Sequence, residues 1–401
     1  MPMRSEGNAL RDLLEKPKQE RESLGCLHTA AEIASQPDVW RKTRKTVLAA
    51  MPALSAFMGG ARALLLTGAG SSYFAALSAV PVLKSAFPRV EAIPSTEILM
   101  DPESSLPREP FTLVSFARSG DSPEGNETVA LCDRLRPGAA RHLVITCSRE
   151  GQLARIAAGL GERAFALLLP EESNDQGLAM TASFTSLALA GYALAFVVAP
   201  DAFRDVVAGI AECAETLLAG GSGVFQSLAR EDFARVFFLG TRPFLGGVLE
   251  AHLKVQELSG GRIVAKAEDT LGFRHGFMAA VDRESLVVLF LSRGAYRRRY
   301  EVDLLGEIRA KGLGRKMLVV ADAARGPDGE PLDSLADGFV EYGAHPSVTD
   351  PFLAPLAAVA GQLLGLFCSL RLGLRPDNPS PSGIINRVVQ GVRIHAWDAG
   401  A

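Results

Sequence analysis

Short apolar runs that stop at glycine or at a polar loop recur along the chain, and each is followed by a stretch with helical spacing. In the first half the apolar runs cover residues 62–67, 111–116, 143–147 and 164–169. The helical stretches between and after them cover residues 73–86, 122–135 and 151–159. Runs of this kind are typical of parallel strands covered on both faces. The alternation therefore predicts a doubly wound α/β sheet.

The same alternation returns in the second half, which predicts an internal duplication. Apolar runs cover residues 236–239, 262–267, 286–291, 316–321 and 338–342, with helical stretches at 246–258 and 303–311. We expect an N-terminal helical segment (1–45), a first unit (46–218) and a second unit with a C-terminal tail (219–401). The glycine-rich segment 219–223 is interpreted as the linker between the units. The predicted fold class is α/β, with two tandem doubly wound units whose mostly parallel sheets are flanked by helices.

Two long apolar stretches need a separate interpretation. Residues 177–200 carry no charge over 24 positions, and residues 351–370 are nearly as apolar. Both are long enough to cross a membrane. The first, however, is rich in small residues and has no lysine or arginine close to its ends. We expect two buried helices on the faces of sheets, and no membrane partner.

Charge and cysteine content exclude several classes of protein. The net charge is −3 over 401 residues, which gives no basic surface for nucleic acid. The five cysteines are scattered and include no C-x-x-C pair, so neither a disulfide framework nor a zinc site is expected. The first residues are polar and charged, with no secretory segment. We expect a cytoplasmic protein that uses no metal or other cofactor.

Two loops that follow predicted strands combine glycines with hydroxyl side chains. Glycine lets backbone amides approach a ligand, hydroxyls can donate to phosphate oxygens, and a helix N-terminus favours an anion. Neither loop matches the P-loop, and the first lacks the third glycine of the dinucleotide motif because Tyr73 stands there. Each loop alone is more typical of a helix cap, but two on neighbouring strands favour a phosphate site. The candidate phosphate-binding residues are Gly70, Ser71, Ser72, Arg118, Ser119, Gly120 and Ser122.

At these loops the chain resembles a known family. The loop 119–122 (S-G-D-S) and the turn 70–72 (G-S-S) resemble those of sugar isomerase (SIS) domains. Longer stretches resemble the tagatose-6-phosphate ketose/aldose isomerase family, also described as galactosamine-6-phosphate deaminase/isomerases. These stretches are 27–33, 115–120, 169–175, 271–276, 375–381 and 386–392. A more distant similarity is to the isomerase domain of glucosamine-6-phosphate synthase.

The resemblance implies three catalytic positions. Glu257 falls on the glutamate that moves the sugar proton, His275 on the histidine that assists ring opening, and Arg387 where a C-terminal lysine would be. Arginine stays protonated, so Arg387 is suited to bind an oxyanion and poorly suited to transfer a proton. Without the resemblance, Glu257 with Glu250 and Lys254 is an ordinary salt-bridged helix face. Family sequences usually have proline after the His-Gly pair, where Phe277 stands here.

The family implies an enzyme that interconverts aldose and ketose hexose or hexosamine 6-phosphates through an enediol or enolamine, with or without deamination. The alternative is a non-catalytic sugar-phosphate sensor, since SIS domains also occur in regulators. We expect a homodimer or larger homo-oligomer, because the family-like site takes its histidine from a neighbouring subunit. The arginine run 297–299, which stands where the second unit would have its serine loop, is interpreted as a solvated or interface feature.

Overall fold

The computed structural model describes residues 2–4, 7–380, 382–389 and 391–397. Residues 381 and 390, which belong to two of the family-like stretches, lie outside this part of the chain.

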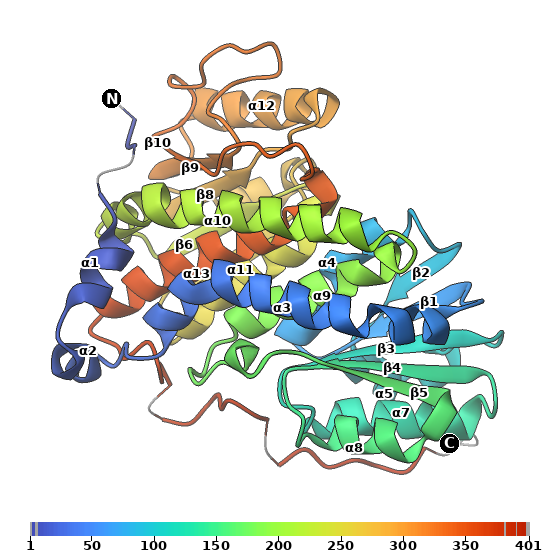
Figure 1. Cartoon of the computed structure of the whole chain (residues 1–401). Helices are drawn as coiled ribbons and strands as arrows, with labels where there is room; N and C mark the ends of the chain where they lie inside the picture. The colour runs from blue at the N-terminus through green and yellow to red at the C-terminus, as the bar shows by residue number, and fades with distance from the viewer. Residues whose placement is uncertain (1, 5–6, 381, 390, 398–401) are drawn as a thin grey trace.

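Two parallel five-stranded sheets form the framework of the molecule (Figure 1). The first sheet has the order β2-β1-β3-β4-β5 and the second has the order β10-β9-β8-β6-β7. The strands of the first sheet are β1 (Ala63–Thr67), β2 (Arg89–Ala92), β3 (Phe111–Ala117), β4 (Ala140–Thr146) and β5 (Ala164–Leu168). Those of the second are β6 (Arg235–Leu239), β7 (Val264–Glu268), β8 (Ser285–Phe290), β9 (Lys316–Ala321) and β10 (Gly338–Glu341).

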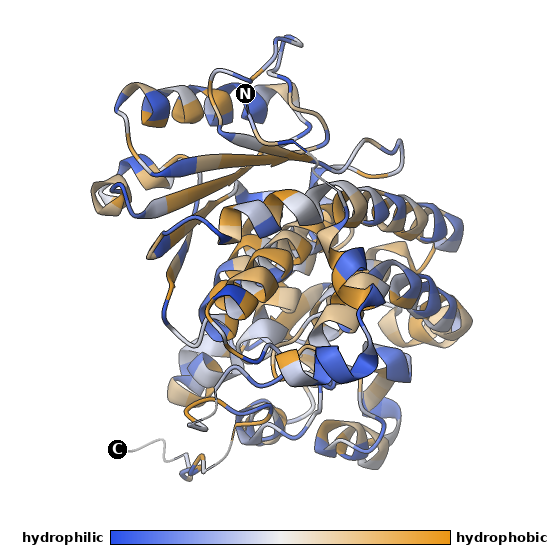
Figure 2. Cartoon of the chain, turned by 90° about the vertical axis from the view of Figure 1, so that its left-hand side faces the viewer, coloured by the Kyte–Doolittle hydropathy of each residue, from blue (hydrophilic) through white to orange (hydrophobic). Residues whose placement is uncertain are grey.

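A layer of helices lies between the two sheets and covers the inner face of both (Figure 1). It contains α3 (Thr29–Met58), α4 (Ser71–Leu83), α9 (Ala182–Ala193), α10 (Pro200–Ala229), α11 (Leu245–Leu258) and α13 (Ala354–Arg371). Inner-face residues of the two sheets, such as Phe116 and Phe238, belong to one continuous hydrophobic core with these helices. Figure 2 shows the hydrophobic residues gathered in this middle layer.

Other helices cover the outer faces and complete two smaller cores. On the first sheet these are α5 (Ser95–Met100), α6 (Pro102–Ser105), α7 (Pro123–Leu135) and α8 (Gln152–Gly159), and on the second sheet α12 (Ala295–Ala310). At the N-terminus, α1 (Ala9–Glu15) and α2 (Lys18–Leu24) precede α3. The predicted α/β class with two tandem parallel sheets is confirmed.

The two uncharged apolar stretches form buried helices, as predicted. Every residue of α9 is buried. In the described part of the chain one helix, α13, is long and apolar enough to cross a membrane, but 89% of its 18-residue window is buried inside the molecule.

The interpretation of residues 219–223 as a linker is wrong. They continue α10, which runs without a break from Pro200 to Ala229. Glycine is used there for close packing, because a Cβ on Gly221 would lie 2.7 Å from Cγ1 of Val340 on β10. The predicted boundaries at 45/46 and 218/219 both fall inside helices, α3 and α10.

Candidate active site

The two serine loops begin side by side at the carboxyl edge of the first sheet. Strands β1 and β3 are neighbours, and Thr67, the last residue of β1, is paired with Ser115 near the end of β3. Open α/β sheets bind ligands at this edge. Ser71 and Ser72 open α4 and are buried. The turn before them requires glycine at Gly68, since a Cβ there would lie 2.7 Å from the backbone carbon of Ser72.

The second loop turns through Gly120, which has a positive φ of 75°. The Asp121 amide donates to the Ser119 hydroxyl over 3.2 Å, and the Asp121 carboxylate accepts from the Gln152 amide over 3.0 Å. Ser122 precedes the first turn of α7 as its N-cap. The chain thus folds the loop back on itself and places its hydroxyls at the start of α7, where an anion is favoured.

Arg118 is buried and its guanidinium is engaged by the backbone. It donates to the Leu178 carbonyl over 3.1 Å and to the Arg387 carbonyl. Burial lowers the pKa of Arg118, while the carboxylates of Asp175 and Glu257 oppose that shift. Arg118 therefore anchors the C-terminal tail beside the serine loop.

A buried ion cluster on α11 joins Glu257 to the first serine turn. The Lys254 ammonium lies 2.6 Å from Oε2 of Glu257 and 3.1 Å from Oε1 of Glu250, and it donates to the Ser71 hydroxyl over 3.2 Å. Lys254 and Glu250 have no exposed side-chain surface, whereas Glu257 is 21% exposed. Lys254, which is not among the candidate site residues predicted from the sequence, is the residue that joins Glu257 to the first serine turn. Its signal was the i, i+4, i+7 spacing with Glu250 and Glu257.

Burial shifts the pKa values in this cluster. Burial raises the pKa of Glu250 to about 7, even though the neighbouring Lys254 ammonium opposes this shift. For Lys254, burial lowers the pKa, but the two carboxylates together raise it above the ordinary value. The lysine is therefore a cation that holds the Glu257 carboxylate in one position.

Glycines on α11 and α13 allow the close helix packing that buries this cluster. A Cβ on Gly246 would lie 2.2 Å from the Ser78 hydroxyl of α4. A Cβ on Gly247 would lie 2.0 Å from the Ala354 carbonyl oxygen of α13, and one on Gly361 would lie 2.3 Å from Cα of Ala251. Helix α11 is therefore held between α4 and α13 at short distance.

His275 lies elsewhere in the second unit. It follows the short helical turn Gly272–Arg274 beyond the edge strand β7, and its side chain is exposed. Phe277, two positions further along the chain, is 41% exposed, and the Lys266 ammonium lies 5.0 Å from the centre of its ring. No contact in the described part of the chain joins His275 to Glu257.

Arg387 holds the C-terminal tail against the first unit. Its guanidinium donates to the Asn174 side chain over 2.8 Å and to the Asp175 carbonyl over 3.0 Å. The Asp175 carboxylate, in turn, accepts from the amides of Thr181, Ala182 and Ser183 at the start of α9. In the structure Arg387 is thus bound to the loop 174–175 and not to the ion cluster.

Two of the family-like stretches, 27–33 and 375–380, meet at residues 176–178. The Asp377 carboxylate accepts from the Thr29 amide over 2.8 Å, and the Asp377 carbonyl accepts from the Leu178 amide over 3.0 Å. Glu32 accepts from the amides of Gln176 and Gly177. Stretches 27–33 and 375–380 are therefore attached to each other and to residues 176–178, which directly follow stretch 169–175.

The arginine run 297–299 is solvated at Arg297 and Arg299, as expected, but not at Arg298. It lies in the first turns of α12, where Arg298 is only 7% exposed. Arg297 pairs with Asp350, Arg298 with Asp322 and Arg299 with Asp328.

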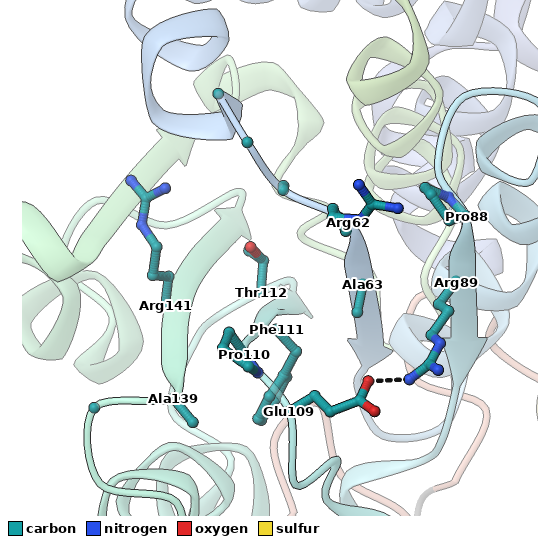
Figure 3. Close-up of a pocket in the computed structure, with 14 residues that line it drawn as sticks. Arg62, Ala63, Pro88, Arg89, Glu109, Pro110, Phe111, Thr112, Ala139 and Arg141 are labelled. Carbon is teal, nitrogen blue, oxygen red and sulfur yellow. Dashed lines mark hydrogen bonds and ion pairs between the residues drawn. The ribbon is translucent and has the colours of Figure 1, made fainter.

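A separate cavity of about 480 Å³ lies at the amino ends of β1, β3 and β4. Arg62, Arg89 and Arg141 line it, and Arg89 pairs with Glu109 (Figure 3). Because this edge is opposite the serine loops, the cavity is not part of the candidate site.

No family model matches the chain, but individual proteins do. A Streptomyces coelicolor relative is 41% identical over 384 residues, which are 92% of this chain and 96% of its own. The D-galactosamine-6-phosphate deaminase AgaS of Escherichia coli is 36% identical over 389 residues, again 92% of this chain and 96% of its own.

Solved structures agree with these relatives. The tagatose-6-phosphate ketose/aldose isomerase from Escherichia coli is 32% identical, with a TM-score of 0.80 over 92% of this chain and 97% of its own. The C-terminal domain of glucosamine-fructose-6-phosphate aminotransferase from Francisella tularensis, at 19% identity and a TM-score of 0.71, shares the fold over 88% of this chain and 98% of its own. With its two parallel sheets and these relatives over nearly its whole length, the chain belongs to the SIS-type family of galactosamine-6-phosphate deaminases and tagatose-6-phosphate ketose/aldose isomerases.

Proposed function

We propose that this chain is a phosphosugar isomerase that acts on a hexosamine 6-phosphate and releases its nitrogen as ammonia. One observation carries the proposal: Lys254 joins the Glu257 carboxylate to the Ser71 hydroxyl, so a base and a phosphate-binding turn share one site. Relatives that are 33% and 36% identical are named D-galactosamine-6-phosphate deaminases. The relatives therefore favour an enzyme over a non-catalytic sensor.

The phosphate is proposed to lie between the two serine loops. The hydroxyls of Ser71, Ser72, Ser119 and Ser122 supply donors, and Gly70 and Gly120 bring backbone amides close. Neutral donors at two helix N-termini can hold a phosphate and still release it.

Glu257 is proposed to be the base. In the open-chain sugar, the proton on C2 is acidic because C1 is an aldehyde. Glu257 removes that proton to give an enolamine and returns it to C1, which leaves a ketimine at C2. Water then adds to the ketimine, so that ammonia leaves and the ketose 6-phosphate remains. A single positioned carboxylate can make both proton transfers.

Lys254 is proposed as a positioning residue. Its ammonium restrains Glu257 and Ser71 at the same time, so it fixes the base relative to the phosphate. Arg387 is proposed to hold the tail over the site through Asn174 and Asp175.

His275 is proposed to assist ring opening from a neighbouring subunit. Its exposed position beyond the edge strand β7 supports this, since a second copy can reach it. We therefore propose a homodimer or larger homo-oligomer. We also propose a cytoplasmic location and two units within each chain, at 46–218 and 219–401.

A second candidate is the interconversion of aldose and ketose hexose 6-phosphates, which involves no nitrogen, because a structure that is 32% identical carries the name tagatose-6-phosphate ketose/aldose isomerase. The two candidates are separated by incubating the protein with a panel of hexose and hexosamine 6-phosphates and following ketose and ammonia together. We expect ammonia and ketose in equal amounts from one hexosamine 6-phosphate. Ketose without ammonia supports the second candidate, and neither product from any member of the panel contradicts the proposed function.

A further inference from the structure

The second unit contains a loop that is equivalent to the serine loop of the first. Strand β8 is central in its sheet, as β3 is in the other, and each is followed by a loop and a helix. The spacing from the last strand phenylalanine to the loop glycine is the same, Phe116 to Gly120 and Phe290 to Gly294. The loop at 292–294 is therefore where a phosphate would lie if the second unit bound one.

Three consecutive amides of this loop donate to carboxylates of the same chain. The Ser292 amide donates to Glu301 over 2.7 Å. The amides of Arg293 and Gly294 donate to the two oxygens of Asp350 over 2.7 Å and 3.3 Å.

Asp350 has the surroundings of a bound anion. Besides the two amides, the Arg297 guanidinium pairs with it, and the carboxylate lies at the N-terminus of the 16-residue helix α12. Asp350 is only 3% exposed. A partly charged helix end, two amides and a guanidinium are the donors that proteins use for phosphate.

In the first unit the nearby carboxylate, that of Glu124, accepts from the Ser122 hydroxyl over 2.6 Å. In the described part of the chain, no carboxylate accepts from the amides of Ser119, Gly120 or Ser122. The two loops thus share a position in the fold but differ in whether an acidic side chain fills them.

We propose that the loop 292–294 with Arg297 is a phosphate cradle that the Asp350 carboxylate occupies, so that removal of this side chain creates a second site for phosphate or a phosphomonoester. The intact chain then keeps one open phosphosugar site, at the serine loops of the first unit, and no substrate phosphate binds at the equivalent loop of the second unit. The inference does not depend on which sugar is turned over, because an anion in this cradle needs no catalysis.

The test uses Asp350→Ala with inorganic phosphate and sulfate as probes, and chloride at equal ionic strength as reference. We expect the melting midpoint of the variant to rise by about 3 °C or more beyond the rise of the parent protein, since a ligand stabilises the folded state that binds it. Calorimetry should show one additional phosphate per chain. A folded variant with the parent's phosphate response and stoichiometry would overturn the proposal.

Asp337→Ala is the matched control. Asp337 also accepts from one amide, that of Met317, and pairs with one arginine, Arg309, but it lies outside the cradle. It should lose stability without gaining a phosphate response. Asp350→Ser repeats the test if the alanine variant is not recovered from chloride buffer, and failure of both to fold even in phosphate also contradicts the proposal, because phosphate should replace the lost carboxylate.

Discussion

A lysine without exposed surface stands at the centre of the proposed site. Burial of a charge is costly unless it is paired, and removal of one partner leaves the other uncompensated. The Lys254 ammonium is paired with two carboxylates, those of Glu250 and Glu257. The fully buried Glu250 thus compensates the lysine, and the partly exposed Glu257 is left to face substrate.

Ser119→Ala should weaken binding of the sugar phosphate. One lost hydrogen bond to an anion costs about 1–3 kcal/mol, which is roughly 5- to 150-fold in Kd. Titration calorimetry with the hexosamine 6-phosphate measures this directly. Ser148→Ala, after the neighbouring strand β4, is the control and should leave the Kd unchanged. Equal affinity of Ser119→Ala and the parent protein would place the phosphate elsewhere.

Glu32 should make stability depend on pH. Burial and the nearby Asp175 carboxylate together raise its pKa to about 7. Between about pH 5 and 7 the folded chain holds a proton that the unfolded chain has released, so the free energy of unfolding falls as pH rises. Glu32→Gln keeps an acceptor for the amides of Gln176 and Gly177 and should flatten this slope in thermal melts. The exposed control Glu162→Gln should keep it. A slope in Glu32→Gln as steep as the parent's would refute the assignment.

At the scale of elements, α11 is the part of the fold that connects the units. It lies against α4 of the first unit on one side and α13 on the other, and glycine forms the closest contacts on both sides. Lys254 therefore contacts Ser71 from a helix that begins more than 170 positions after Ser71 in the sequence.

Gly246→Ala should separate α11 from α4. Its Cβ would lie 2.2 Å from the Ser78 hydroxyl and 2.5 Å from the Phe74 carbonyl oxygen. Overpacking of this kind costs about 1–3 kcal/mol, and we expect a lower melting midpoint together with slower turnover. Gly306→Ala, in α12 with nothing near its Cβ, is the matched control and should stabilise by up to about 1 kcal/mol. Full stability and turnover in Gly246→Ala would contradict the role given to this contact.

Most of the helices and strands could be predicted from sequence, because the pattern of apolar residues within each one reflects which of its faces are buried. The apolar runs predicted the buried strands. Strand β2 was not predicted, because its sequence Arg-Val-Glu-Ala alternates between polar and apolar residues and lies at the sheet edge. Residues 219–223 were mistaken for a linker because glycine marks both loops and close packing. The serine loops could be predicted because their residues are adjacent in sequence. The contact of Arg118 with the Arg387 carbonyl could not, since 269 positions separate the two residues.

At the scale of the whole molecule, the chain places its two sheets around one shared helical core. The first unit presents the serine loops, and the second contributes the ion cluster through α11. The exposed His275 lies beyond the edge of the second sheet. The proposed site is therefore completed by His275 from a second copy of the chain.

Mixing two inactive variants tests this shared site. Glu257→Gln and His275→Ala should each be inactive alone. In a dimer assembled from equal amounts of both, half of the molecules carry one intact site, so about a quarter of the parental activity should return. Unfolding and refolding the two together, against each refolded alone, provides the comparison. The shared site is refuted if the mixture recovers no activity and light scattering shows that the fully active parent protein is a monomer.

The central claim is that Glu257 moves the proton between C2 and C1, and deuterium wash-in at C2 tests it most directly. Glu257→Gln keeps the shape and loses the base, so exchange should slow by about 100- to 10,000-fold while the sugar phosphate still binds. His275→Asn is the companion variant, because it should impair ring opening and leave exchange of the open-chain sugar intact. If Glu257→Gln exchanges the C2 proton at the parental rate, the base lies elsewhere and the account of the site is wrong.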